Sequence, residues 1–71
     1  MSLFFDDEFA EKILAMPEYR QGANRIKVTL NDGRVFRGVF VAWGREVIRV
    51  EGLTSIPFEV EDVSSIENDL G

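Results

Sequence analysis

The sequence has 71 residues, of which 45% are hydrophobic and 30% charged, with a net charge of −5. This composition is typical of one small soluble domain and is too apolar for a chain that stays disordered. The absence of cysteine excludes disulfides and thiolate metal sites, and the absence of histidine removes the side chain best suited to acid–base catalysis at neutral pH.

A helix is predicted over about residues 3–16, where apolar side chains recur at a spacing near 3.6 residues. Three acidic residues from Asp6 onward suit the positive N-terminal end of the helix dipole, and Pro17 disfavours helical geometry at the residue before it. The most apolar cluster of this segment consists of Phe4, Phe5 and Phe9. We expect this face to cover one opening of the fold, or otherwise to bind a second subunit or a partner protein.

From Arg25 the period of the apolar residues changes to two, which predicts a strand over residues 25–30. Residues 31–33, Asn-Asp-Gly, predict a tight hairpin turn in which Gly33 adopts a positive φ. A longer strand over residues 34–43 is apolar on both faces, and Gly38 in its middle predicts a sharp bend.

Three further short strands are predicted over residues 45–51, 55–60 and 63–66. Pro57 cannot donate a hydrogen bond to a neighbouring strand, so we place it at an edge or an outward-facing position. One helix followed by five short strands predicts a mainly β fold, a small, strongly bent barrel in which closure avoids long open edges. We expect a single domain over residues 1–71, with the barrel spanning about residues 25–67.

The second strand carries a family resemblance in Asp32-Gly33-Arg34, in Phe36, Gly38 and Phe40 at two-residue steps, and in Trp43 at its end. This arrangement resembles the Sm-like family, whose members have an N-terminal helix followed by a five-stranded, SH3-like barrel. The resemblance covers about residues 3–67. It implies a homo-oligomeric ring joined through edge strands, with a role in RNA binding or as an RNA chaperone.

The residues that form the RNA pocket of this family are not present. Sm-like proteins usually have an aspartate and then an asparagine after the bent strand, where residues 44–47 read Gly-Arg-Glu-Val. They usually have an arginine or lysine followed by glycine between the last two strands, where residues 60–63 read Val-Glu-Asp-Val. The strand–Asp–Gly–strand pattern and the ending Val63-Ser64-Ser65-Ile66-Glu67 loosely resemble the Rho-inhibitor family, small bacterial Sm-like barrels that bind a protein partner.

The charge pattern fits two functions from different classes. Residues 20–49 carry seven basic and two acidic side chains, a net charge of +5, whereas residues 1–19 carry −4 and residues 50–71 carry −6. A basic middle favours single-stranded RNA, and acidic ends favour either a basic partner protein or the basic segment of a second copy. A third interpretation is that these charges only keep the surface solvated.

The candidate nucleic-acid-binding residues are Arg25, Lys27, Arg34, Arg37, Trp43, Arg45 and Arg49. The basic side chains would contact phosphates, while Trp43, or Tyr19, would stack on a base, anchor an interface or lie in the core. The other aromatic residues of the strands, Phe36, Phe40 and Phe58, are predicted to lie in the core.

No catalytic motif is present, because the serines lack a histidine and a Gly-x-Ser-x-Gly context, so we do not expect an enzyme. No glycine-rich phosphate loop precedes a helix, and the acidic clusters do not match a calcium loop, so we expect neither a cofactor nor a metal. The sequence has no apolar run long enough to cross a membrane and no signal-peptide pattern, from which we expect a cytoplasmic location.

Overall fold

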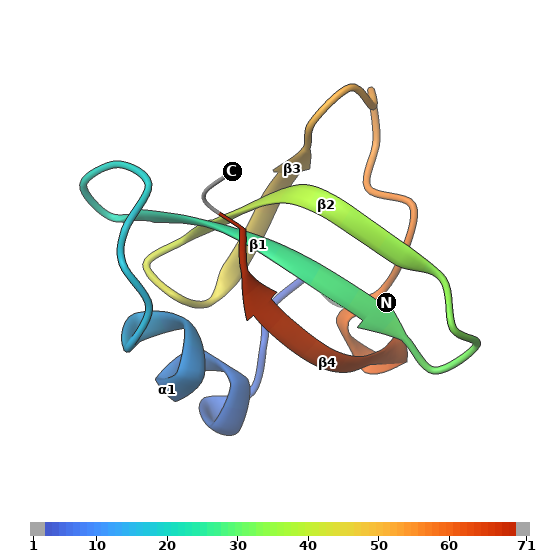
Figure 1. Ribbon diagram of the computed structural model, residues 1–71, viewed down its shortest axis with the longest axis horizontal. Helices are drawn as coiled ribbons and strands as arrows, with labels where there is room; N and C mark the ends of the chain where they lie inside the picture. The colour runs from blue at the N-terminus through green and yellow to red at the C-terminus, as the bar shows by residue number, and fades with distance from the viewer. Residues whose placement is uncertain (1–2, 70–71) are drawn as a thin grey trace.

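The computed structural model describes residues 3–69 and shows one N-terminal helix followed by an open, antiparallel sheet (Figure 1). The elements are α1 (Asp7–Leu14), β1 (Ala23–Leu30), β2 (Val35–Ala42), β3 (Glu46–Val50), the 3-10 helix η1 (Val60–Asp62) and β4 (Val63–Asn68). The strands lie in the order β3-β2-β1-β4, so β3 and β4 are at the two edges. The predicted mainly β fold with an N-terminal helix is thus confirmed.

Helix α1 is shorter at both ends than the predicted range of residues 3–16. Its start is set by Asp6, whose carboxylate accepts a hydrogen bond from the backbone N–H of Phe9 at 3.0 Å. This contact satisfies one of the N–H groups that have no partner within the first turn of a helix. At the other end the backbone N–H of Met16 donates to Ile13 at 3.0 Å, which closes the last turn before Pro17.

The residues before α1 run along the edge of β3 and are not helical. The backbone N–H of Phe5 donates to the carbonyl of Arg45 at 2.8 Å, and the N–H of Val47 donates to the carbonyl of Leu3 at 2.9 Å. The ring of Phe5 is buried in the core all the same. Because the side chain is buried in either conformation, its apolar character could not distinguish an extended segment from a first helical turn.

Strands β1 and β2 form the predicted hairpin, and the pairing of β2 is irregular at Gly38. Ile26 pairs with Val39 and Val28 pairs with Phe36, so two residues of β2 lie opposite one residue of β1. Gly38 adopts a φ of 62° in this bulge. A bulge increases the local twist and bends the strand.

Residues 55–60, predicted as a strand, do not form one. They run as irregular chain into η1, whose turn is closed by the N–H of Asp62 donating to the carbonyl of Glu59 at 3.0 Å. Pro57 lacks the N–H that a strand at this position would need. Within residues 3–69 the sheet therefore has four strands and is open, and β4 extends to Asn68, beyond the predicted end of the last strand.

The hydrophobic core lies between one face of the sheet, α1 and the chain before β4. Its fully buried side chains include Phe5, Ile13, Ile26, Val28, Val39, Val41 and Val47. Phe58 is buried in this core and Phe36 packs against it, as predicted, with their ring centroids 5.6 Å apart. Phe40 is buried on the opposite face of the sheet, which we call the outer face, because it alternates with Val39 and Val41.

One buried polar side chain ties the helix to the sheet. Asn24, at the start of β1, is 1% exposed, and its amide donates to the carbonyl of Ile13 at 3.1 Å. It also lies 3.4 Å from the carbonyls of Met16 and Pro17. These carbonyls lie at and just after the last turn of α1, so Asn24 gives the end of the helix an additional buried hydrogen-bond donor. In the part of the chain described, no helix has the length and apolar character needed to cross a membrane.

Candidate functional site

Most of the predicted nucleic-acid-binding side chains form ion pairs within the chain. The closest pairs are Arg25–Glu51 (3.2 Å), Lys27–Glu67 (3.3 Å), Arg34–Asp32 (2.8 Å), Arg37–Asp69 (3.4 Å) and Arg45–Asp7 (2.8 Å). A carboxylate beside a basic group offsets the charge that would otherwise attract phosphates. The basic middle of the sequence is therefore largely balanced by the acidic ends once the chain is folded.

The most buried of these contacts centre on Asp69, just after β4. Its carboxylate is 7% exposed, accepts a hydrogen bond from the backbone N–H of Gly38 at 2.9 Å, and lies 4.0 Å from Arg25 and 3.4 Å from Arg37. The Nε atom of Arg25 is buried without a hydrogen-bond partner. Asp69 thus joins the end of the sheet to the bulge in β2, which indicates a structural role for Arg25.

Two guanidinium groups form no ion pair with any carboxylate of residues 3–69, and both lie over aromatic rings. Arg49 lies 4.3 Å from the ring centroid of Phe40, and Arg20 lies 5.6 Å from that of Tyr19. The two rings meet edge to face at 5.3 Å. We call these four residues the outer-face cluster. It contains one predicted site residue, Arg49.

Trp43 is not in the core, because its side chain is 73% exposed. It occupies the turn between β2 and β3 with a φ of 52°, and its backbone N–H donates to the carbonyl of Gly22 at 2.7 Å. One face of the indole ring lies against Gly22, where an added Cβ would stand 2.8 Å from the ring. The exposure of Trp43 excludes a place in the core. An interface anchor and a stacking platform remain as the two interpretations of this residue.

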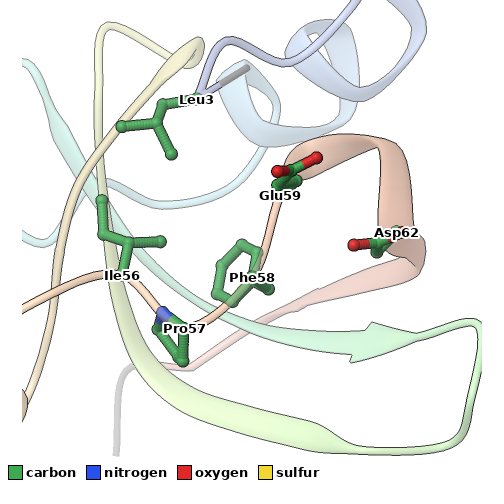
Figure 2. A pocket seen from close by; sticks show the side chains of 6 residues that line it. All are labelled: Leu3, Ile56, Pro57, Phe58, Glu59 and Asp62. Atoms are coloured by element: carbon green, nitrogen blue, oxygen red, sulfur yellow. The ribbon is translucent and has the colours of Figure 1, made fainter. Parts of the chain in front are cut away.

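A pocket of about 550 Å³ opens where the fourth strand was predicted (Figure 2). Its lining residues are Leu3, Ile56, Pro57, Phe58, Glu59 and Asp62. Figure 2 shows Leu3 and Ile56 pointing toward each other, with the ring of Phe58 between Ile56 and the two carboxylates. We call this the acidic pocket. Its volume lies within the range of ligand-binding pockets, about 300–1,000 Å³.

The carboxylates around this pocket have no cationic partner. Eight of the 13 acidic side chains form no ion pair among the described residues: Asp6, Glu8, Glu11, Glu18, Glu46, Glu59, Glu61 and Asp62. Two of them line the acidic pocket, and two more, Asp6 and Glu61, line an adjacent pocket of about 340 Å³ whose other residues are mostly apolar. Half of the unpaired acidic side chains therefore lie beside apolar surface.

The backbone at this pocket is also unpaired. Residues 54–58 form no hydrogen bond with any other residue described, either through the backbone or through side chains. Exposed, unpaired backbone next to apolar side chains is the arrangement to which an extended peptide can add as a strand. The acidic pocket thus combines apolar contacts, negative charge and available backbone groups.

One carboxyl group in the β1–β2 turn has a shifted pKa. The backbone N–H of Arg34 donates to Asp32 at 3.0 Å, and the Nε of the same residue donates at 2.8 Å. The backbone hydrogen bond, with a smaller contribution from the guanidinium group, lowers the pKa of Asp32. Asp32 is exposed and lies in the turn next to Gly33. The lowered pKa therefore reflects hydrogen bonds within this turn.

The acidic pocket was not predicted as a site from the sequence. Residues 55–60 were predicted to form a strand, and the acidic residues that follow do not match a calcium loop. The available signal was the combination of Pro57 with the acidic residues Glu59, Glu61 and Asp62 that follow it. No group of three acidic side chains within residues 3–69 is arranged to hold a metal ion.

Comparison with protein-family models, with curated proteins and with solved structures found no match for this chain.

Proposed function

We propose that this protein is an interaction module that binds a basic and apolar segment of a partner protein in the acidic pocket. The observation that carries this proposal is the difference in charge pairing: Glu59 and Asp62 have no cationic partner, whereas most basic side chains do. The apolar floor would supply affinity, and the carboxylates would attract and orient a lysine or arginine.

The unpaired backbone of residues 54–58 suggests how the partner binds. An extended partner segment that hydrogen-bonds to this stretch would place alternate side chains toward the pocket and toward solvent. A suitable segment has an apolar side chain for the floor formed by Ile56 and Phe58, with a basic residue next to it.

The test is the binding of a labelled ten-residue peptide in which leucine alternates with arginine, followed by fluorescence anisotropy. We expect binding that weakens with added salt but is not abolished, because the apolar contact remains when charges are screened. The double variant Glu59→Lys and Asp62→Lys should lose at least tenfold in affinity.

The matched control is Glu8→Lys with Glu11→Lys, which makes the same change in net charge on the exposed side of α1. Neither residue lines the acidic pocket. An equal loss of affinity in both double variants would show that only the net charge attracts the peptide, and would contradict the proposal.

The second candidate function is the binding of single-stranded RNA by an Sm-like homo-oligomer, and the outer-face cluster favours it. Arg20 and Arg49 form no ion pair with a described carboxylate, and exposed Trp43 follows β2 on the same hairpin as Phe40 and Arg49. Bases stack on exposed aromatic rings beside basic groups. RNA binding that is lost in Arg49→Ala would support this function; absence of binding to a short single-stranded RNA at low salt would exclude it.

A further inference from the structure

The turn between β2 and β3 contains an aromatic residue where the backbone disfavours one. Trp43 has a φ of 52° and Gly44 a φ of 73°, and the N–H of Arg45 donates to the carbonyl of Ala42 at 3.0 Å. Positive φ values at both central residues of the turn from Ala42 to Arg45 are those of type I′, which favours asparagine or glycine at the first central position. A tryptophan there is strained, and strain of this kind is concentrated at functional positions.

Because Trp43 is exposed, packing in the hydrophobic core does not explain why a tryptophan occupies this position. At 73% it is the most exposed large apolar side chain among residues 3–69, and Leu14, at 62%, lies beside Gly44 in the same turn. The ring is nevertheless held in one place, because its other face lies against Gly22. We call Trp43 and Leu14 the Trp43 knob: a projecting, oriented apolar surface.

The acidic pocket is a matching recess. It offers an apolar floor of a size suited to a large side chain, with Glu59 and Asp62 at its rim. Arg20 lies in the loop that holds Trp43, since the N–H of Trp43 donates to Gly22 two residues further on, and it forms no ion pair with a described carboxylate. The lining of the pocket therefore contains acidic but no basic residues, while the loop that contacts the knob carries Arg20.

Two acidic side chains also lie near the knob. The carboxylate of Glu18 accepts a hydrogen bond from the N–H of Gly22 at 2.8 Å, and Glu46 follows Arg45 at the start of β3. The carboxylate of Glu18 is therefore already hydrogen-bonded to the loop backbone. Glu46 lies at the edge of β3, where its backbone pairs with that of Phe4 in the N-terminal segment.

The knob and the pocket lie on opposite sides of the molecule. In Figure 1 the yellow turn between β2 and β3 is on the left, and the orange segment that leads into η1 is on the right. One copy therefore cannot fill its own pocket. A contact between the knob of one copy and the pocket of the next is head to tail, and each bound pair still presents one knob and one pocket.

We propose that the acidic pocket of one copy receives the Trp43 knob of a second copy, so that the protein associates head to tail. This proposal rests on the proposed function, because it assigns an occupant to the same pocket. A second copy is favoured over another partner because this chain itself carries an exposed aromatic residue, and an arginine in the loop that contacts it, which complement the apolar and acidic lining of the pocket.

The experiment uses Trp43, the sole tryptophan of the chain, as its own reporter. We expect its fluorescence emission to move to shorter wavelength as the concentration is raised from micromolar to millimolar, while light scattering shows the mass at least doubling. The variant Trp43→Asn, which suits the type I′ turn, should remain monomeric. The variant Glu59→Lys with Asp62→Lys should also remain monomeric, with its emission unchanged by concentration.

Mixing these two variants gives the decisive result. One retains an intact pocket and the other an intact knob, so a head-to-tail contact predicts a one-to-one dimer and nothing larger. A wild-type chain that stays monomeric with constant emission, or association that persists in Trp43→Asn, would overturn the proposal. The leucine–arginine peptide separates the two claims: if it binds Trp43→Asn while wild type stays monomeric, the proposed function stands and self-association fails.

Discussion

The indole ring of Trp43 lies against the backbone of Gly22, so that a Cβ added to Gly22 would stand 2.8 Å from two atoms of the ring. The same two residues are joined by a backbone hydrogen bond of 2.7 Å. Gly22 has a φ of 77°, which residues other than glycine rarely adopt. The loop before β1 therefore fixes the orientation of the exposed tryptophan through both contacts.

The variant Gly22→Ala should lower the free energy of unfolding by about 1–3 kcal/mol, because it adds a clash with Trp43 to the strain of a positive φ. The matched control is Gly33→Ala: Gly33 has a φ of 92° but no atom within 4 Å of an added Cβ, so only the backbone strain remains. Urea unfolding measures both. Equal losses would contradict a supporting role for Gly22 beneath the ring.

The variant Asn24→Ala should lower the free energy of unfolding by about 1–3 kcal/mol, because it removes the buried hydrogen bond from the Asn24 amide to the carbonyl of Ile13 at the end of α1. Exposed Asn68, at the end of β4, is the control, and its replacement by alanine should change stability by no more than about 0.5 kcal/mol. If both variants unfold at the same urea concentration, Asn24 does not hold the helix to the sheet.

The two ion pairs at the β4 edge should differ in strength. Asp69→Asn removes the charged acceptor of the Gly38 N–H, while Arg25 keeps its closer partner Glu51 at 3.2 Å, and it should cost about 1.5–3 kcal/mol, the range for a hydrogen bond to a charged group. Glu67→Gln removes the exposed partner of Lys27 and should cost less than about 1 kcal/mol. Thermal unfolding compares them, and a larger loss for Glu67→Gln would refute the structural role given to Asp69.

An NMR titration should find the pKa of Asp32 below the ordinary aspartate value, because the N–H of Arg34 donates to its carboxylate. Since folding lowers this pKa, the stabilisation is present above the unfolded-state pKa and is lost as the pH falls through the folded-state pKa. Arg34→Ala should raise the pKa only partly, since the backbone donor remains. Full return to the ordinary value would mean that the guanidinium group is the main cause.

The outcome at each segment shows which features local sequence patterns can predict. The hairpin at Asn31-Asp32-Gly33 depends on local backbone preferences, and the strands around it depend on period-two alternation, so both were predictable. The strand predicted over residues 55–60 has the same alternation, but alternation reports only which side chains are buried. Whether the backbone there finds a neighbouring strand depends on distant parts of the chain.

The candidate site was less predictable, because its properties arise from pairing between distant residues. The sequence shows an excess of arginine in its middle, yet Asp69 lies 32 residues from its partner Arg37 and Asp7 lies 38 residues from Arg45. Which charges remain unpaired is decided only when the ends of the chain fold back. The exposure of Trp43 likewise follows from a turn geometry that its sequence context, Trp-Gly, does not favour.

The most direct test of the acidic pocket as a binding site is to map amide chemical-shift changes during titration of the leucine–arginine peptide into the 15N-labelled protein. We predict that the largest changes fall on Ile56, Phe58, Glu59 and Asp62, with slowed amide exchange at residues 54–56 and 58 as new backbone hydrogen bonds form. Changes confined to the outer-face cluster, or spread evenly over all acidic residues, would contradict the account.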